Sequence, residues 1–324
     1  MNESPLWRRS GLRIRGYGHH YPRTLVENDT AEDVGTNPVD AAVIGKIDVR
    51  SHYVAQDDET PILMGAAAAS NALVDAGMHP DDVDLVVMSN WTDRQFVPEL
   101  APRTAEALGA RNALAFDVCG ACTGFVHGVQ TAASMLSTTP HWSTAVIVSA
   151  ERFSRRVRPE SKGQLIVGDA AGAVVLTKSD VDGDAAPGLI DSLLFSDGAR
   201  WDATTVLPPE GWIRSRKDLL ETGVASQSEV VIKLLKRSGL DIADIDWVVP
   251  HPGTGALHRA VREALGIPEE RFVTNYEVRG NTGSAAIPIV LSEMRADGRL
   301  ARGDRVLTPA VGAGWFYGGL LFHV

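Results

Sequence analysis

Cysteine is scarce in this chain, and long apolar runs are absent from it. Two cysteines among 324 residues exclude a scaffold held by many disulfides and favour a reducing compartment, here the cytoplasm. No apolar run approaches the roughly 20 residues of a membrane-spanning helix. The first segment also lacks the apolar stretch of about 7–15 residues that a secretory signal contains. We therefore expect a cytoplasmic protein that does not enter a membrane.

Positive charge is also in deficit. The chain has 31 lysine and arginine residues against 41 aspartate and glutamate residues, which gives a formal net charge of −10. Nucleic acids and anionic membrane surfaces are polyanions, so we expect neither as a partner. The apolar share of 44% and the charged share of 22% are those of a globular protein, and the length is sufficient for two structural halves.

What the sequence does contain is an internal repeat. Each short match is weak on its own, but matches that recur in the same order indicate a duplication. Five pairs of segments follow one another in this way: 77–87 with 239–249, 106–110 with 263–267, 116–124 with 276–283, 146–150 with 306–310, and 168–176 with 312–322.

Each half of the repeat alternates strand-like and helix-like segments and ends in a glycine-rich pair of strands. This alternation predicts α/β units on a mostly parallel sheet. The strand-like runs LVVMS, AVIVSA and WVVPH are apolar almost throughout, which is expected where both faces of a sheet are covered. Turn-forming residues cluster over 177–190, so we expect an N-terminal half over 1–180 and a C-terminal half over 181–324.

The repeat also relates three residues that have useful side-chain chemistry. Cys122 of the first half corresponds to Asn281 of the second, and both are expected just after a strand, where a helix begins. His251 ends the strand-like run WVVPH. Because open α/β sheets bind ligands at the carboxyl ends of their strands, we expect the three side chains to converge. Taken singly, each also has a structural interpretation: a buried thiol, a core imidazole and a turn asparagine.

Both cysteines lie in FDVCGACTGF, in a Cys-x-x-Cys spacing that fits a redox dithiol, half of a metal site, or one nucleophile beside a bystander. A zinc site needs about four ligands, and the sequence has no second cysteine pair. A redox dithiol usually lies near the start of a much smaller unit. We therefore expect Cys122 to be a nucleophile whose thiolate is stabilised by the helix start and a nearby imidazole. Cys119 is expected to pack in the core.

The surroundings of Cys122 suit an acyl thioester. The small residues of CGACTG let such a group approach the backbone. The N–H group of Cys122 is one expected donor to an oxyanion, and the glycine-rich loop 312–314 is the expected source of a second.

The chain resembles the β-ketoacyl-acyl carrier protein synthase III family of the thiolase superfamily. The resemblance rests on FDVCGACTGF, DWVVPH, RGNTGSAAIP, VGDAAGAVVL and GAGWFYGG. It implies a thiolase fold, five-layered αβαβα and built from two duplicated βαβαβαββ halves, and a homodimer. It also implies a catalytic triad of Cys122, His251 and Asn281, with no metal and no other cofactor.

The same resemblance implies 3-oxoacyl synthesis in two steps. Cys122 accepts an acyl group from a coenzyme A or acyl carrier protein thioester, and a malonyl-type thioester then loses carbon dioxide and condenses with it. His251 and Asn281 donate hydrogen bonds to the enolate, which requires a neutral imidazole. The N–H groups of Cys122 and Ala313 form the oxyanion hole.

Two other functions are open to such a chain. One is an acyltransferase of the same fold that moves the acyl group from Cys122 to a hydroxyl or amine without condensation. The other is a non-catalytic partner subunit. Retention of Asn281 favours condensation over simple transfer, and the presence of Cys122 disfavours the partner subunit.

The segments expected to hold the thioester handle depart from the family pattern. Ala42 and Lys46 stand where the family has a tryptophan and an arginine against the adenine of coenzyme A, which removes a stacking platform and a planar cation. These departures favour specialised polyketide or fatty-acid-derived metabolism over housekeeping fatty-acid initiation. The residues expected to bind the substrate are Phe96, Val97, Arg155, Arg156, Trp212, Arg214, Thr254 and Gly312.

Overall fold

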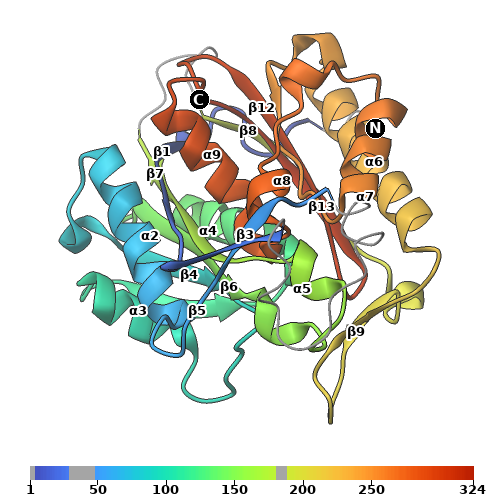
Figure 1. The fold of residues 1–324 in the computed structure, drawn as a ribbon. Coiled ribbons are helices and arrows are strands. Elements are labelled where there is room, and N and C mark those ends of the chain that lie inside the picture. Colours follow the sequence, from blue (N-terminus) through green and yellow to red (C-terminus); the bar gives the residue numbers. More distant parts are fainter. Residues whose placement is uncertain (1–3, 29–47, 180–187) are drawn as a thin grey trace.

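Two β-sheets form the framework of the protein (Figure 1). The computed structural model describes residues 4–28, 48–179 and 188–324. The first sheet has the strand order β1 (Leu12–His20), β7 (Asp169–Lys178), β6 (Thr144–Arg152), β4 (Leu85–Ser89), β5 (Leu114–Val118). The second has the order β11 (Trp247–Val248), β12 (Arg305–Gly312), β13 (Phe316–His323), β8 (Leu189–Ser196). Two further strand pairs are β2 (Thr24–Glu27) with β3 (Ser51–Val54), and β9 (Thr204–Val206) with β10 (Ile213–Ser215).

Both sheets are mixed, so the expectation of mostly parallel sheets is wrong. β4 runs parallel to β5 and β6, and β11 runs parallel to β12. In contrast, β1, β7 and β6 alternate in direction, and so do β12, β13 and β8. Residues 313–315 alone join β12 to β13. This connection is long enough for a hairpin and too short for the crossover that parallel neighbours need.

Helices cover the faces of the two sheets and produce five layers (Figure 1). α2 (Pro61–Ala76) and α3 (Leu100–Leu108) pack outside the first sheet, and α6 (Leu219–Ser238) packs outside the second with α7 (Gly255–Ala264) beside it. α4 (Gly124–Thr138) and α9 (Ala286–Ala296) form the middle layer, and α4 contacts strands of both sheets. In the described part of the chain, no helix combines the length and apolar character that crossing a bilayer requires.

Small residues let α2 approach β1 closely. The helix begins with a side-chain cap from Thr60 and with Pro61 in its first turn, and it ends at Gly77. A Cβ atom on Gly16 or Gly18 of β1 would lie 2.2 Å from a main-chain oxygen of α2. Larger residues in β1 would therefore separate the helix from the sheet.

The first match of the repeat has the same structure in both halves. α2 and α6 each end at a left-handed glycine, Gly77 with a φ of 64° and Gly239 with a φ of 66°. A short 3-10 turn follows each glycine, and β4 or β11 then begins. The first sheet ends at Lys178 and the second begins at Leu189. The boundary expected at 180/181 lies outside the described residues and stays a prediction.

Two segments near the expected site differ from their predicted form. Residues 276–279, matched to the strand before Cys122, form the short helix α8 (Tyr276–Arg279). Carbonyl groups of α8 accept hydrogen bonds from Arg50 N and Ser51 Oγ instead of from a neighbouring strand of a sheet. β11 extends only over Trp247–Val248, although Val249 N and His251 N still donate to Leu307 O and Pro309 O of β12.

Candidate active site

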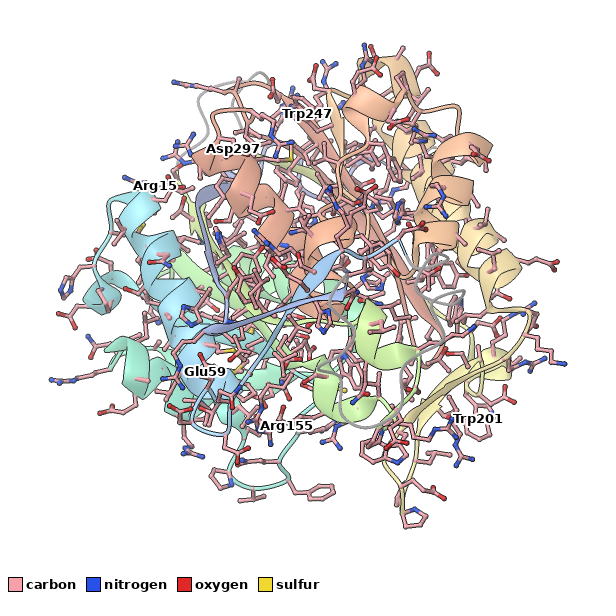
Figure 2. All side chains as sticks on the ribbon, in the orientation of Figure 1. Arg15, Glu59, Arg155, Trp201, Trp247 and Asp297 are labelled. Carbon is pink, nitrogen blue, oxygen red and sulfur yellow. The ribbon has the colours of Figure 1, made fainter. Side chains whose placement is uncertain are left out.

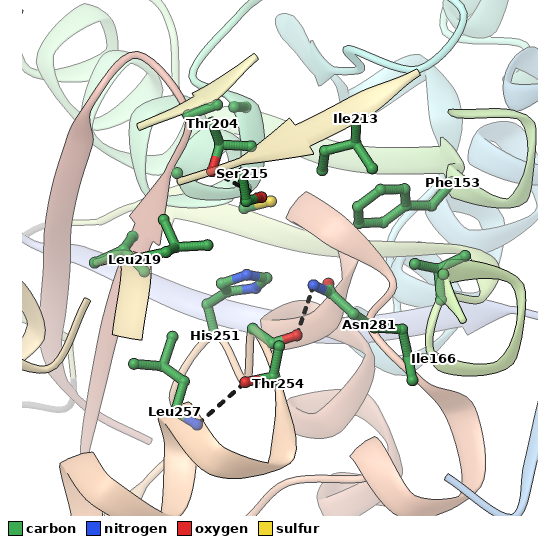
Figure 3. Close-up of a pocket in the computed structure, with 18 of the residues that line it drawn as sticks. Phe153, Ile166, Thr204, Ile213, Ser215, Leu219, His251, Thr254, Leu257 and Asn281 are labelled. Carbon is green, nitrogen blue, oxygen red and sulfur yellow. Dashed lines mark hydrogen bonds between the residues drawn. The ribbon is translucent and has the colours of Figure 1, made fainter. Parts of the chain in front are cut away.

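Cys122, His251 and Asn281 line one cavity with a volume of about 480 Å³. Figure 3 shows His251 and Asn281 with their side chains in the same space. The structure thus brings the three residues together, although they come from distant parts of the chain. The rest of the lining is largely apolar and includes Trp91, Phe153, Val157, Ile166, Ile213, Leu219 and Leu257.

Cys122 lies at a sharp turn between β5 and α4, within the 3-10 turn Ala121–Thr123. Ala121 has a φ of 45°, a left-handed conformation that is strained for a residue with a side chain. A Cβ atom on Gly312 would lie 3.0 Å from both Cys122 N and Thr123 N. A glycine at this position therefore allows the end of β12 to reach the backbone of Cys122.

The thiol of Cys122 is protonated at neutral pH. Burial raises the pKa of this thiol to about 12, and the nearby negative charge of Glu151 adds to the rise. The expectation of a lowered thiol pKa is wrong, because the loss of water around the sulfur outweighs the main-chain hydrogen bond that lowers this pKa.

His251 is held by its main chain just beyond β11. Its N–H group donates to Pro309 O over 2.9 Å, and its carbonyl oxygen accepts from Gln227 Nε2 over 3.2 Å. The residue is 3% exposed, and burial lowers the pKa of the imidazole to about 4. The ring is consequently neutral at physiological pH and has one N–H donor.

Asn281 is fixed through both its main chain and its side chain. Its N–H group donates to Ile166 O over 2.8 Å, and its carbonyl oxygen accepts from Gly168 N over 3.0 Å. The side-chain Nδ2 donates to Gly253 O over 2.9 Å, and Oδ1 accepts from Gly283 N over 2.9 Å. An amide nitrogen carries two hydrogens, so the second remains for a ligand in the cavity.

Glu151 is a buried acid that the sequence interpretation missed. It ends the apolar run of β6 and is 0% exposed. Its Oε1 accepts from Ser284 Oγ over 2.6 Å, and its Oε2 accepts from Thr92 Oγ1 over 2.8 Å and from Trp91 N over 3.2 Å. Burial raises the pKa of this carboxyl to about 7. An acid directly after VIVSA, at the expected ligand-binding edge, was the available signal.

The remaining predicted residues fall into two groups. Thr254, Gly312 and Ala313 line the cavity, and Thr254 Oγ1 also caps α7 by accepting from Leu257 N over 3.2 Å. Six others do not line it among the described residues: Phe96, Val97, Arg155, Arg156, Trp212 and Arg214.

Three residues of the N-terminal half are exposed. Phe96 and Val97 are 95% and 92% exposed on the connection between β4 and α3. Cys119 is also exposed, so the expectation that it packs in the core is wrong. It follows β5, which is the edge strand of the first sheet and has no neighbour on one side.

The arginines have acidic or carbonyl partners outside the cavity. Arg155 lies at the outer surface (Figure 2), with Nη2 2.5 Å from Asp57 Oδ1. Arg156 Nε donates to Thr92 O, and Arg214 pairs with a glutamate at 3.6 Å. Substrate binding by these residues stays a prediction. The expected adenine-site positions, 42 and 46, lie outside the described residues.

The described residues contain no group of three or more histidine, cysteine, aspartate or glutamate side chains placed to hold a metal ion.

Comparison with known proteins identifies the family. The family model described as 3-oxoacyl-[acyl-carrier-protein (ACP)] synthase III matches residues 116–198, and the model for its C-terminal part matches residues 235–324. A β-ketoacyl-[acyl-carrier-protein] synthase III from Erythrobacter litoralis is 33% identical over 317 residues, which cover 95% of this chain and 98% of that protein. The chain belongs to the synthase III family. The resemblance drawn from the motifs is thus confirmed, and this synthase III is a condensing enzyme of the acyltransferase class.

Solved structures agree with this assignment. A synthase III from Aquifex aeolicus superposes with a TM-score of 0.88 at 28% identity and covers 97% of this chain and 100% of that one. A priming β-ketosynthase from the R1128 polyketide pathway has a TM-score of 0.87 at 28% identity, with coverage of 98% and 97%. The thiolase fold expected for this synthase III is therefore confirmed.

Proposed function

We propose that this synthase III catalyses decarboxylative Claisen condensation through an acyl-Cys122 intermediate. One observation carries the proposal: a thiol, a neutral imidazole and a free amide N–H group line the same largely apolar cavity. Cys122, His251 and Asn281 are the proposed catalytic residues. An apolar enclosure strengthens hydrogen bonds to developing charge, because little water competes for them.

The first proposed half-reaction loads the enzyme. The sulfur of Cys122 attacks the carbonyl carbon of an acyl thioester, the bond between that carbon and the departing sulfur breaks, and the departing thiol takes up the proton that Cys122 releases. The N–H groups of Cys122 and Ala313 are proposed to hold the oxyanion. The close approach of Gly312 to Cys122 N supports this role, since it brings the loop of Ala313 beside the nucleophile.

The second proposed half-reaction forms the carbon–carbon bond. A malonyl-type thioester loses carbon dioxide, and the electron pair of the broken bond moves to its thioester enolate. His251 and Asn281 donate hydrogen bonds to the enolate oxygen. The enolate carbon then attacks the acyl carbonyl, and the bond from that carbonyl to Cys122 breaks, which releases a 3-oxoacyl thioester and a thiolate that takes a proton.

The proposed substrates are acyl thioesters of coenzyme A or of an acyl carrier protein, together with a malonyl-type thioester. The relatives are named as β-ketoacyl-[acyl-carrier-protein] synthases, which supports an acyl carrier protein as the carrier of the thioester. The similarity to a priming ketosynthase of a polyketide pathway supports service in specialised metabolism. The acting form is proposed to be a cytoplasmic homodimer.

The proposed substrate-binding residues divide by position. Thr254 and Gly312 line the cavity and are proposed to contact the substrate near its reacting carbonyl. The others are proposed to contact the handle or a carrier at the surface: Phe96, Val97, Arg155, Arg156, Trp212 and Arg214.

The test follows acyl-enzyme mass and carbon dioxide release separately. The Cys122→Ala variant should take up no acyl group from any thioester, whereas Cys119→Ala, its matched control, should load like the wild type. Loading by Cys122→Ala, or loss of loading in Cys119→Ala, would contradict the assigned nucleophile.

The Asn281→Ala variant separates the two half-reactions. It removes one donor to the enolate, so carbon dioxide release should fall by on the order of 10²-fold, while loading of Cys122 changes far less. If the wild type loads acyl groups, releases no carbon dioxide from any malonyl thioester and acylates an alcohol or amine, condensation is wrong.

A further inference from the structure

One side chain that lines the cavity carries a positive charge at neutral pH. Among the described lining residues this is Lys217, since the imidazole of His251 is neutral. Lys217 lies between the end of β10 and the start of α6 and is exposed. An ammonium group at the border of a largely apolar cavity needs hydrogen-bond acceptors, which solvent or a ligand has to supply.

The acidic residues around Lys217 are already paired with arginines. Arg216 lies 3.2 Å from Asp202 and 3.2 Å from Asp218, and Arg200 lies 3.8 Å from Asp218. Within the described part of the chain, no carboxylate lies within 4.0 Å of the Lys217 ammonium. Among the described residues, Asp202 and Asp218 thus pair with arginines, and the ammonium group of Lys217 is left to solvent or to a ligand.

Further donors lie on the same wall of the cavity. Thr204 of β9 and Ser215 of β10 face each other across the strand pair with their hydroxyl oxygens 3.3 Å apart, and both line the cavity (Figure 3). α6 then begins its 20 residues without a side-chain cap from Asp218. The positive dipole end of a long helix favours an anion together with the lysine.

We propose that Lys217, with Thr204 and Ser215, binds an anionic oxygen group of the thioester substrate. This inference rests on the proposed function. Lysine suits the role because its ammonium group is a point charge on a flexible stem and can follow a mobile anion. Two parts of a substrate carry such a group: a terminal carboxylate on a dicarboxylic acyl chain, or the phosphate of a phosphopantetheine handle.

The experiment uses four thioesters that separate these two sources. Hexanoyl and adipoyl groups, which differ by a terminal carboxylate, are each attached to pantetheine and to phosphopantetheine, which differ by a phosphate. Loading of Cys122 is followed by intact-protein mass for the wild type, Lys217→Gln and Lys217→Arg. Lys236→Gln is the matched control, because it removes an exposed lysine from the opposite end of α6.

Lys217→Gln should lower the loading rate at limiting thioester by roughly tenfold for donors that carry the recognised anion. Donors without that anion should load as before, and Lys217→Arg should restore most of the difference. A loss confined to the adipoyl pair assigns the carboxylate, and a loss confined to the phosphopantetheine pair assigns the phosphate.

Equal rates for Lys217→Gln and wild type with all four donors, or an equal loss with all four, would overturn the inference while the proposed function stands. If the wild type loads from none of the four donors, the failure lies with the proposed function.

Discussion

At the residue scale, the protonation state of the Cys122 thiol depends on a second buried group, the carboxyl of Glu151. The thiol has a pKa of about 12, raised by burial and by Glu151, and the pKa of Glu151 is itself raised by burial to about 7. Above pH 7 the carboxylate is therefore charged while the thiol is still neutral. The negative charge of Glu151 opposes the formation of a second one on Cys122.

Glu151→Gln should make Cys122 more reactive towards iodoacetamide. Removal of the carboxylate charge lowers the thiol pKa, and below its pKa each unit of decrease raises the thiolate fraction about tenfold. Glutamine fits the site, because its oxygen accepts from Thr92 and Trp91 and its nitrogen donates to Ser284 Oγ. The measurement is the rate of Cys122 alkylation between pH 7 and pH 10.

Two comparisons make this result specific. Glu151→Asp retains the charge and should keep the wild-type pH dependence, and alkylation of the exposed Cys119 in the same samples is the internal reference for reagent reactivity. Identical Cys122 profiles in Glu151→Gln and wild type would contradict the charge coupling.

At this scale the sequence identified the residues of the candidate site but did not predict how deeply they are buried. The repeat related Cys122 to Asn281 and assigned His251 to a strand end, and the structure brings all three to one cavity. The thiol pKa was predicted in the wrong direction, because burial is set by residues far away in the chain. Lys217 ends the basic run WIRSRK, a stretch that the sequence predicts to receive a phosphopantetheine handle or a carrier protein, but only the structure places this lysine in the lining of the cavity.

At the element scale, the approach of β12 to the turn before α4 depends on a single glycine. A Cβ atom at position 312 would lie 3.0 Å from Cys122 N, Thr123 N and Gly120 O, which are all main-chain atoms and cannot rotate away. The strand end or the turn must therefore shift when a side chain is added.

Gly312→Ala should slow loading of Cys122 by about tenfold or more, because displacement of the proposed oxyanion donors weakens transition-state stabilisation. Gly198→Ala is the matched control, since a Cβ atom there meets no atom within 4 Å. Loading is measured by mass and folding by circular dichroism. A Gly312→Ala enzyme that loads as fast as the control would show that this close approach has no role in acyl transfer.

The secondary structure was predicted wrongly where hydrogen bonds to distant segments, and not the local sequence pattern, determine the backbone conformation. Residues 276–279 match the strand before Cys122 in sequence, yet they form α8, because segments of the N-terminal half bind their carbonyl groups. The buried strands β4 and β6 were predicted correctly, since covered strands need only be continuously apolar.

At the scale of the whole molecule, the two sheets share one core. The middle layer contributes Phe125 of α4 and Leu291 of α9 to a cluster that also contains Leu320 of the second sheet. A hydrogen bond of 2.6 Å from Ser284 Oγ to Glu151 Oε1 also joins the turn before α9 to β6 of the first sheet. Unfolding of one sheet therefore exposes apolar surface of the other.

Heating should give a single transition in which secondary structure and the protection of Cys122 from alkylation are lost together. Ser284→Ala removes a hydrogen bond to a buried acid and should cost about 2 kcal/mol, which lowers the midpoint of both signals equally. The measurement pairs circular dichroism with alkylation along one temperature series. Separate midpoints would show that the halves melt independently.

The main-chain bonds of Asn281 to residues 166 and 168 also bear on how this enzyme can diversify. Ile166 and Val167 form part of the cavity wall, and the same stretch of backbone holds Asn281. A change of side-chain volume there would disturb Asn281, the proposed enolate donor, along with the proposed acyl-binding wall of the cavity. Phe153 and Ile213 line the cavity from the turn after β6 and from β10. New acyl specificities should therefore arise by substitution of Phe153 or Ile213. A change of side chain at either position alters the shape of the cavity without altering the main-chain segment that holds Asn281.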